Sequence, residues 1–102
     1  MIEQIINNIN YRLDEENLTA EVIKKSEGYE GDIIIPETVV FNTATYRVKN
    51  IGEDAFDGCK SLTNITFQGT IAQWKKIKLR ENWKDEVPVT VIHCTDGDVE
   101  IY

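Results

Sequence analysis

The stretch IGEDAFDGCKSLTNITF, residues 51–67, changes its hydrophobic spacing along its length. Its apolar residues have helix-like separations up to Cys59 and approach the alternation of a strand beyond it. Gly52 gives the backbone freedom, so residues 53–59 can form one helical or 3₁₀ turn with a buried side. The stretch therefore predicts a tight turn between two short strands, with Phe56 and Cys59 pressed into an interior.

The chain has the length and composition of a single globular domain. A domain of 102 residues can bury about two-thirds of the surface of its extended chain. Its hydrophobic content of 41% and charged content of 28% are ordinary for such a domain. No apolar run reaches the roughly 20 residues of a membrane helix, so we expect no membrane insertion.

The net charge is −7 and is unevenly distributed. Residues 1–32 carry eight acids and three bases, whereas the rest of the chain carries ten acids and eight bases. This field opposes non-specific attraction to nucleic acid, so we expect no nucleic-acid binding. The residues after Met1 lack the pattern of a secretion signal, which fits either an intracellular protein or a piece of a longer exported one.

The N-terminal third predicts a short helical turn followed by a hairpin. Isoleucines at positions 2, 5, 6 and 9 have the spacing of an amphipathic helix, although residues 9–13 also alternate like a strand. Polar residues 14–17 then separate two alternating segments, which is typical of a β-hairpin.

Hairpins are also predicted in the middle and at the end of the chain. Residues 33–35 predict a strand that ends at Pro36, and residues 39–48 predict a second hairpin around a polar turn. The turn pair Asp96-Gly97, after the strand-like segment VTVIHC, predicts a closing hairpin that runs to Tyr102.

One helix is expected, over residues 71–79. Thr70 and Gln73 have the spacing of a capping box, in which each side chain satisfies a backbone donor at the start of a helix. The apolar residues that follow recur on one helical face.

The opening stretch resembles the repeat of BspA-type leucine-rich-repeat proteins, whose units read approximately IGxxAFxGCxxLxxIxIP. Residues 33–39, IIIPETV, are similar to the end of a preceding unit. The segments INYRLDEENLTAEVI, FQGTIAQWKKI and VIHCTDGD are similar to the ends of many arrays of this family. In this interpretation the repeat core consists of Ile51, Gly52, Ala55, Phe56, Gly58, Cys59, Leu62, Ile65 and Phe67.

The resemblance implies a particular fold class, although the chain departs from a regular array. Only one repeat is complete, and solenoids generally need three or more. We therefore expect a mostly β, α+β fold: a short leucine-rich-repeat coil in a single domain. Its parts would be an N-terminal cap hairpin (1–32), a repeat region (33–69), and a C-terminal helix with a closing hairpin (70–102).

No residue pattern indicates catalysis. His93 and Cys94 are neighbours on a predicted strand and should face opposite sides, so they cannot act as base and nucleophile. Neither Ser26 nor Ser61 lies in a nucleophile elbow. A triad of Ser61, His93 and an acid is kept only as a remote alternative. We expect no enzymatic activity and no cofactor.

No metal site is expected either. Two cysteines and one histidine cannot complete a four-ligand zinc site from nitrogen and sulfur alone. The acids of residues 96–100 lack the spacing of a calcium loop and fit a hairpin turn better. Cys59 and Cys94 can form a disulfide, but buried free thiols are favoured.

Residues 74–84 interleave basic side chains with two tryptophans. The favoured interpretation is that Trp74 joins the core and the cations form a solvated helix face. The alternative is a contact surface for phosphate or an acidic partner that uses Arg80 and Trp83, because an exposed tryptophan suits a binding hot spot. The basic residues are Lys75, Lys76, Lys78, Arg80 and Lys84.

The leading functional hypothesis is a non-enzymatic module that binds a protein or glycan partner through outward side chains such as Lys49, Thr63 and Thr66. The family resemblance implies a surface or secreted bacterial protein with a role in attachment. The alternative is a small acidic cytoplasmic protein that binds and blocks a partner's cationic site, as the acidic N-terminal part suggests.

Overall fold

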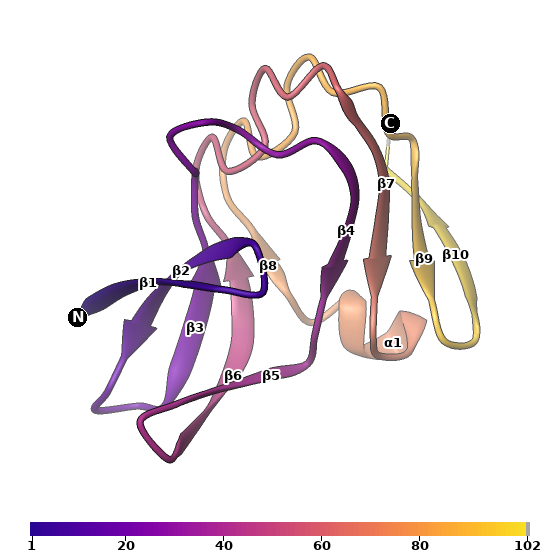
Figure 1. Ribbon diagram of the computed structural model, residues 1–102. Helices are drawn as coiled ribbons and strands as arrows, with labels where there is room; N and C mark the ends of the chain where they lie inside the picture. The colour runs from indigo at the N-terminus through magenta and orange to yellow at the C-terminus, as the bar shows by residue number, and fades with distance from the viewer. Residues whose placement is uncertain (102) are drawn as a thin grey trace.

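Two β-sheets contain most of the regular backbone of the computed structural model, which describes residues 1–101 (Figure 1). The strands are β1 (Ile2–Ile6), β2 (Ile9–Asp14), β3 (Thr19–Val22), β4 (Gly31–Ile35), β5 (Thr38–Phe41), β6 (Ala44–Ile51), β7 (Leu62–Phe67), β8 (Lys78–Leu79), β9 (Val91–Cys94) and β10 (Gly97–Glu100). The helix α1 (Ile71–Trp74) lies between β7 and β8.

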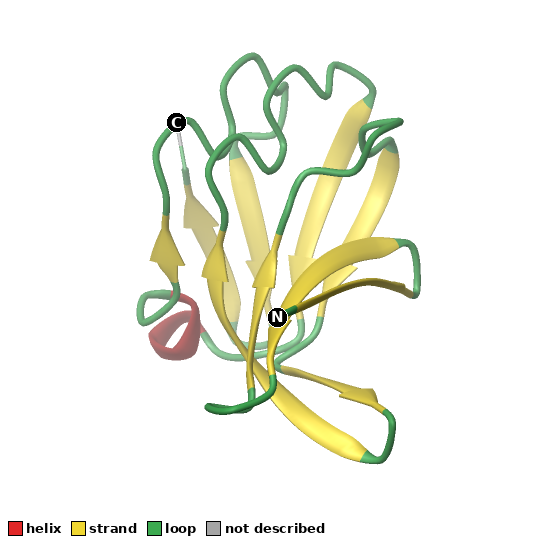
Figure 2. Cartoon of the chain, turned by 90° about the vertical axis from the view of Figure 1, so that its left-hand side faces the viewer, coloured by secondary structure: helices red, strands yellow, loops and turns green. Residues whose placement is uncertain are grey.

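Both sheets mix parallel and antiparallel pairs. The six-stranded sheet has the order β1-β2-β3-β6-β5, and β8 also pairs with β6. The four-stranded sheet has the order β10-β9-β7-β4. The chain passes from the first sheet to the second three times, from β3 to β4, from β6 to β7 and from β8 to β9. Figure 2 shows the loops of these passages at the end of the molecule away from α1.

The three predicted hairpins are present. The pairs β2–β3, β5–β6 and β9–β10 are antiparallel, and β4 ends at Ile35, directly before Pro36. The last hairpin turns at Thr95 and Asp96, because Gly97 is already paired with Cys94. The part of this prediction that falls on Tyr102 lies outside the described residues.

The helical turn predicted near the N-terminus is wrong. Residues 2–6 form strand β1, which pairs with β2 from Ile2↔Leu13 to Ile6↔Ile9. The two turn residues, Asn7 and Asn8, have positive φ angles of 47° and 72°. Asparagine tolerates this left-handed conformation, and a two-residue turn of this kind matches the twist of the strands that it joins.

The stretch at residues 51–67 forms the end of β6, a chain of turns, and β7. The turns are held by short-range backbone bonds, in which Ala55 N donates to Gly52 O at 3.1 Å and Cys59 N donates to Phe56 O at 3.0 Å. Gly58 has φ 73°, a conformation that suits glycine. This segment therefore buries Phe56 and Cys59, as predicted, without forming a helix.

Gly52 is needed for a close approach to β3. Its N–H donates to Val22 O at 2.7 Å, and a Cβ at this position would lie 2.7 Å from the Glu21 carboxylate and 3.0 Å from Val22 O. A larger residue would push the turn away from the sheet.

Five aromatic rings connect the turns to the rest of the interior. Neighbouring centroids along the series Tyr29, Phe56, Trp83, Trp74, Phe67 are 5.2, 6.2, 6.1 and 5.6 Å apart. Such edge and tilted contacts add to the free energy gained by burial. Side chains of both sheets and of this aromatic series belong to one buried cluster.

The predicted helix is shorter than expected. The capping box of Thr70 and Gln73 is confirmed, but the helix ends at Trp74. Lys78 and Leu79 instead pair in parallel with Asn50 and Ile51 as strand β8. Pairing with the long strand β6 replaces the expected last helical turn.

The predicted fold class, a short leucine-rich-repeat coil with one helix near residues 71–79, is wrong, although its mostly β character is confirmed. The molecule is a small compact domain with principal extents of 34 × 31 × 22 Å. Antiparallel hairpins make up a large part of both sheets, so the strands do not form the uniform parallel ladder of a solenoid. One complete repeat has too few like neighbours on which to bury its faces, and the hairpins supply that pairing instead.

Candidate binding surface

The described surface contains a groove of about 600 Å³. We call it the edge groove, because strands β4 and β5 line it and each lies at the edge of its sheet. Residues of the β1–β2 turn and Tyr11 also line it. Segments that are far apart in the sequence, from Ile6 to Gln68, therefore meet at this groove.

Two exposed apolar side chains lie at the edge groove. Ile34 of β4 is 54% exposed and Val40 of β5 is 62% exposed. Their neighbours Ile33, Ile35 and Val39 are buried, as expected from the alternation of side chains along a strand. An apolar surface that is held in place by buried neighbours is suited to contact with a partner.

The strands beside the groove have unpaired outer edges. Within residues 1–101, β4 pairs only with β7, and β5 pairs only with β6. Ile35 O accepts a hydrogen bond from Gln68 N at 2.9 Å, on the β7 side. Because successive residues direct their backbone groups to alternate sides, the N–H and C=O of Ile34 point to the free edge. Such an edge can pair with another extended chain.

A buried lysine holds the β1–β2 turn in its place beside the groove. Lys25, which is 9% exposed, donates from Nζ to Asn8 O at 3.0 Å and to Asn8 Oδ1 at 2.6 Å. Its ammonium also lies 5.0 Å from the centroid of the Tyr29 ring. A lysine in a loop segment gives no sequence pattern that predicts burial, so sequence analysis missed this contact.

Tyr29 connects the same turn region to the interior. Its hydroxyl donates to Ile23 O at 2.7 Å and accepts from Asn10 N at 3.0 Å. Burial raises the pKa of Tyr29 to about 12, and burial also raises the pKa of Tyr11, which lines the groove. Both phenols therefore stay neutral at ordinary pH and serve as packing and hydrogen-bonding groups.

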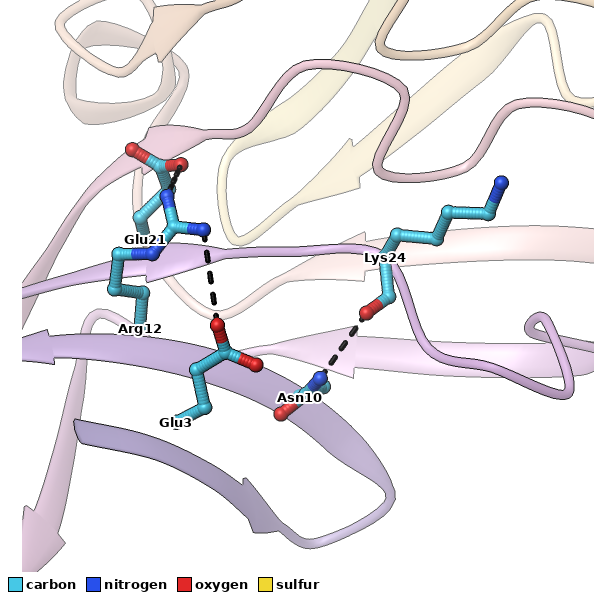
Figure 3. A network of polar contacts seen from close by, with 5 residues as sticks. All are labelled: Glu3, Asn10, Arg12, Glu21 and Lys24. Atoms are coloured by element: carbon cyan, nitrogen blue, oxygen red, sulfur yellow. Dashed lines mark hydrogen bonds and ion pairs between the residues drawn. The ribbon is translucent and has the colours of Figure 1, made fainter.

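The outer face of the six-stranded sheet is different, because it carries a group of three charged side chains, on β1, β2 and β3, that pair with one another. Figure 3 shows Arg12 between Glu21, at 3.3 Å, and Glu3, at 3.8 Å. Beside them, Asn10 Nδ2 donates to Lys24 O at 3.0 Å. These contacts neutralise part of the acidic N-terminal region.

The residues of the predicted repeat core lie mostly in the interior. Ile51, Gly52, Ala55, Phe56, Cys59, Leu62, Ile65 and Phe67 are buried, whereas Gly58 is exposed at the turn.

The two residues expected to contact a partner are placed differently. Arg80 is exposed, but Trp83 is only 8% exposed and packs between Phe56 and Trp74. The expectation rested on an exposed tryptophan, and Trp83 is buried. Trp83 lies beyond the predicted helix, so the sequence pattern did not predict its burial. The rings that cover it are Phe56, from the turns of residues 51–67, and Trp74, from α1.

Both cysteines are free thiols, as the favoured interpretation had it. Cys59 is buried, and its sulfur accepts from Tyr29 N at 3.3 Å. Cys94 is half-buried, and burial, followed by the charges of Asp96 and Asp98, raises its pKa. A raised pKa lowers the thiolate fraction and so the reactivity of this thiol.

His93, a residue considered for catalysis, contacts an acid in the described part of the chain. His93 Nδ1 lies 2.9 Å from Asp98 Oδ1 on the neighbouring strand, in an exposed position. No group of three or more histidines, cysteines and acids in residues 1–101 is arranged to hold a metal ion. The only helix of these residues, α1, is also far too short to cross a bilayer.

Comparison of the sequence with models of known protein families, with curated proteins and with solved structures gives no match. The resemblance to the BspA-type repeat therefore stays a prediction from the residues of the opening stretch.

Proposed function

We propose that this domain is a non-enzymatic binding module that takes up an extended segment of a protein partner in the edge groove. A position at the cell surface and a role in attachment, which the repeat resemblance implies, belong to the same proposal. The observation that carries it is the coincidence of exposed Ile34 and Val40 with the free edges of β4 and β5.

An extended peptide fits this groove better than other occupants. Its backbone would add a strand to β4 or β5, and its alternate side chains would contact Ile34 or Val40. Main-chain pairing supplies affinity without demanding one sequence, and the apolar contacts supply selectivity. A glycan would leave the two apolar side chains without comparable burial.

The alternative of an acidic protein that blocks a cationic site has less support. The exposed acids of residues 1–32 are spread over four segments: Glu3 on β1, Glu15 and Glu16 in the β2–β3 turn, Glu27 and Glu30 in the β3–β4 loop, and Asp32 on β4. The turn and the loop lie at opposite ends of β3, and Glu3 pairs with Arg12, so these acids do not gather on one segment.

The proposal can be tested with a library of random peptides displayed on phage. Peptides selected on the wild-type domain should lose at least about tenfold in affinity on Val40→Lys and Ile34→Lys variants, because a charge would have to be desolvated in the groove. Leu18→Lys is the matched control, since Leu18 is an exposed apolar residue outside the groove.

Two results would contradict the proposal. One is a set of selected peptides that bind the groove variants and the wild type equally well. The other is a glycan from an array whose binding is lost in both groove variants, while the peptide library yields no binder.

A further inference from the structure

A second hollow, of about 310 Å³, lies between β6 and the segment that follows α1. We call it the basic pocket, because Arg47, Lys49 and Lys76 line it and Glu37 is its only acid. It is separate from the edge groove. Pro36 and Thr38 line the groove, whereas Glu37 between them lines the pocket.

The charge of this pocket opposes that of the whole molecule. The chain has a net charge of −7, yet the lining of the basic pocket carries three cations and one carboxylate. Among residues 1–101, Arg12 forms ion pairs with Glu3 and Glu21, and His93 contacts Asp98, but none of the pocket cations is in such a contact. Within these residues, the pocket cations are therefore outside ion pairs and can interact with an anionic ligand.

The fold places these cations together from separate segments. Arg47 and Lys49 are alternate residues of β6, so both side chains project from the same face of that strand. Lys76 follows α1, whose start is fixed by the capping box of Thr70 and Gln73. Cations from β6 and from the segment after α1 therefore line one pocket.

Apolar residues also line the basic pocket, and we call them its floor. Phe67 and Ile77 belong to the buried cluster and are therefore held in place, whereas Val48, which also lines the pocket, directs its side chain to the opposite face of β6 from Arg47 and Lys49. The volume lies at the lower end of the range of ligand pockets, about 300–1,000 Å³, which fits a small molecule or a single side chain.

From this lining, we infer that the basic pocket binds an oxyanion, a phosphate or carboxylate, that is attached to a compact apolar group. The oxyanion would accept hydrogen bonds from Arg47, Lys49 and Lys76, and the apolar group would cover the floor. Either a free small molecule or an anionic side chain of a protein partner carries this chemistry.

The test uses phenyl phosphate and two-dimensional NMR of the ¹⁵N-labelled full chain. We expect amide shifts confined to β6 and to residues after α1, and weaker binding as the salt concentration rises. Inorganic phosphate should bind at least about tenfold more weakly, because it cannot cover the apolar floor. Benzyl alcohol, which has no charge, should not bind at this site.

Lys76→Gln and Lys75→Gln form a matched pair for the same titration. Both residues are exposed and adjacent, and both substitutions change the net charge equally, but Lys75 does not line the basic pocket. Lys76→Gln should weaken binding of phenyl phosphate roughly tenfold, and Lys75→Gln should leave it nearly unchanged. Unchanged amide positions elsewhere would show that both variants are folded.

A short peptide that contains phosphotyrosine distinguishes the two sources of the ligand. Tighter binding of the peptide than of phenyl phosphate supports a protein partner, and equal or weaker binding supports a free small molecule. The inference is overturned if Lys75→Gln and Lys76→Gln weaken binding equally, if inorganic phosphate binds as tightly as phenyl phosphate, or if phenyl phosphate does not bind.

Discussion

The aromatic interior and the edge groove have opposite properties. Around Phe56, rings from three loops, a helix and a strand pack against one another and exclude water. Around Ile34 and Val40, two strand edges and two apolar side chains face solvent. Tyr29 and Lys25 lie between these regions and connect the interior to the β1–β2 turn.

This difference separates the residues that stabilise the molecule from those that are available to a partner. Burial of an aromatic side chain contributes several kcal/mol, whereas an exposed apolar residue contributes little to folding. Substitutions in the interior should therefore lower the free energy of unfolding, and substitutions at the groove should alter binding alone. The experiments that follow test this separation.

The largest effect is expected for Phe56→Ala. Removal of a fully buried ring that contacts Tyr29 and Trp83 should lower the free energy of unfolding by about 3–5 kcal/mol. Urea unfolding followed by circular dichroism measures the change. Val40→Ala, at the groove, should shift the same curve by less than about 0.5 kcal/mol. Comparable losses in the two variants would show that the groove is part of the stabilising core.

Tyr29→Phe should have a smaller effect, of about 2 kcal/mol. The variant keeps the ring but removes the hydroxyl that donates to Ile23 O and accepts from Asn10 N, so buried backbone groups lose a partner. Urea unfolding at neutral pH measures this loss. An unchanged free energy of unfolding would mean that water replaces the hydroxyl at no cost.

The same variant has a consequence at alkaline pH. Burial raises the pKa of Tyr29 from 10.0 to about 12, so the unfolded chain loses this proton at lower pH than the folded one. The contribution of the neutral Tyr29 phenol to the free energy of unfolding is fully present below pH 10 and is lost as pH rises towards about 12. Tyr29→Phe should therefore flatten the decline in the free energy of unfolding over this interval, relative to wild type.

Lys25→Met tests the connection between the interior and the groove. The apolar stem is retained, but Asn8 O and Oδ1 lose their donor, so we expect a loss of about 1 kcal/mol in the free energy of unfolding. Amide hydrogen exchange should become faster at the β1–β2 turn and stay unchanged near Phe56.

Lys24→Met is the matched control for this experiment, because Lys24 is exposed and adjacent. It should leave the exchange rates of the β1–β2 turn as they are in wild type. Equal acceleration in both variants would mean that loss of positive charge, and not the Lys25–Asn8 contact, loosens the turn.

The smallest effect is expected at the β2–β3 turn, whose residues neither line the edge groove nor belong to the aromatic series. The Asn17 side chain donates to Asp14 Oδ2 at 2.8 Å, and this bond, followed by the bond from Asn17 N, lowers the pKa of Asp14. Asn17→Ala should raise the pKa of Asp14 towards its ordinary value in an NMR titration. Asn42→Ala, in another turn, should not change it.

Several elements could be predicted because their cause lies within a few residues. Alternating apolar residues predicted the hairpins β2–β3, β5–β6 and β9–β10, and Pro36 marked the end of β4. The pair Thr70 and Gln73 predicted the start of α1. Each depends on turn chemistry, on capping or on side-chain alternation, all of which act locally.

Other elements could not be predicted from local spacing. The isoleucines of β1 fit a helix as well as a strand, and pairing with β2 decides between them. Residues 78 and 79 continue a helical pattern, yet they pair with β6. The repeat-like stretch suggested a solenoid, but the pairing of the flanking hairpins produced two mixed sheets.

The sequence by itself determined the turns, the cap and which residues of the 51–67 stretch are apolar enough to be buried. Only the tertiary structure decided the burial of Trp83 and Lys25, the free edges at the groove and the convergence of Arg47, Lys49 and Lys76. The reason is that side-chain periodicity records contacts between near neighbours in the chain. A groove or pocket depends instead on which distant strands pair, and that choice minimises the free energy of the whole fold.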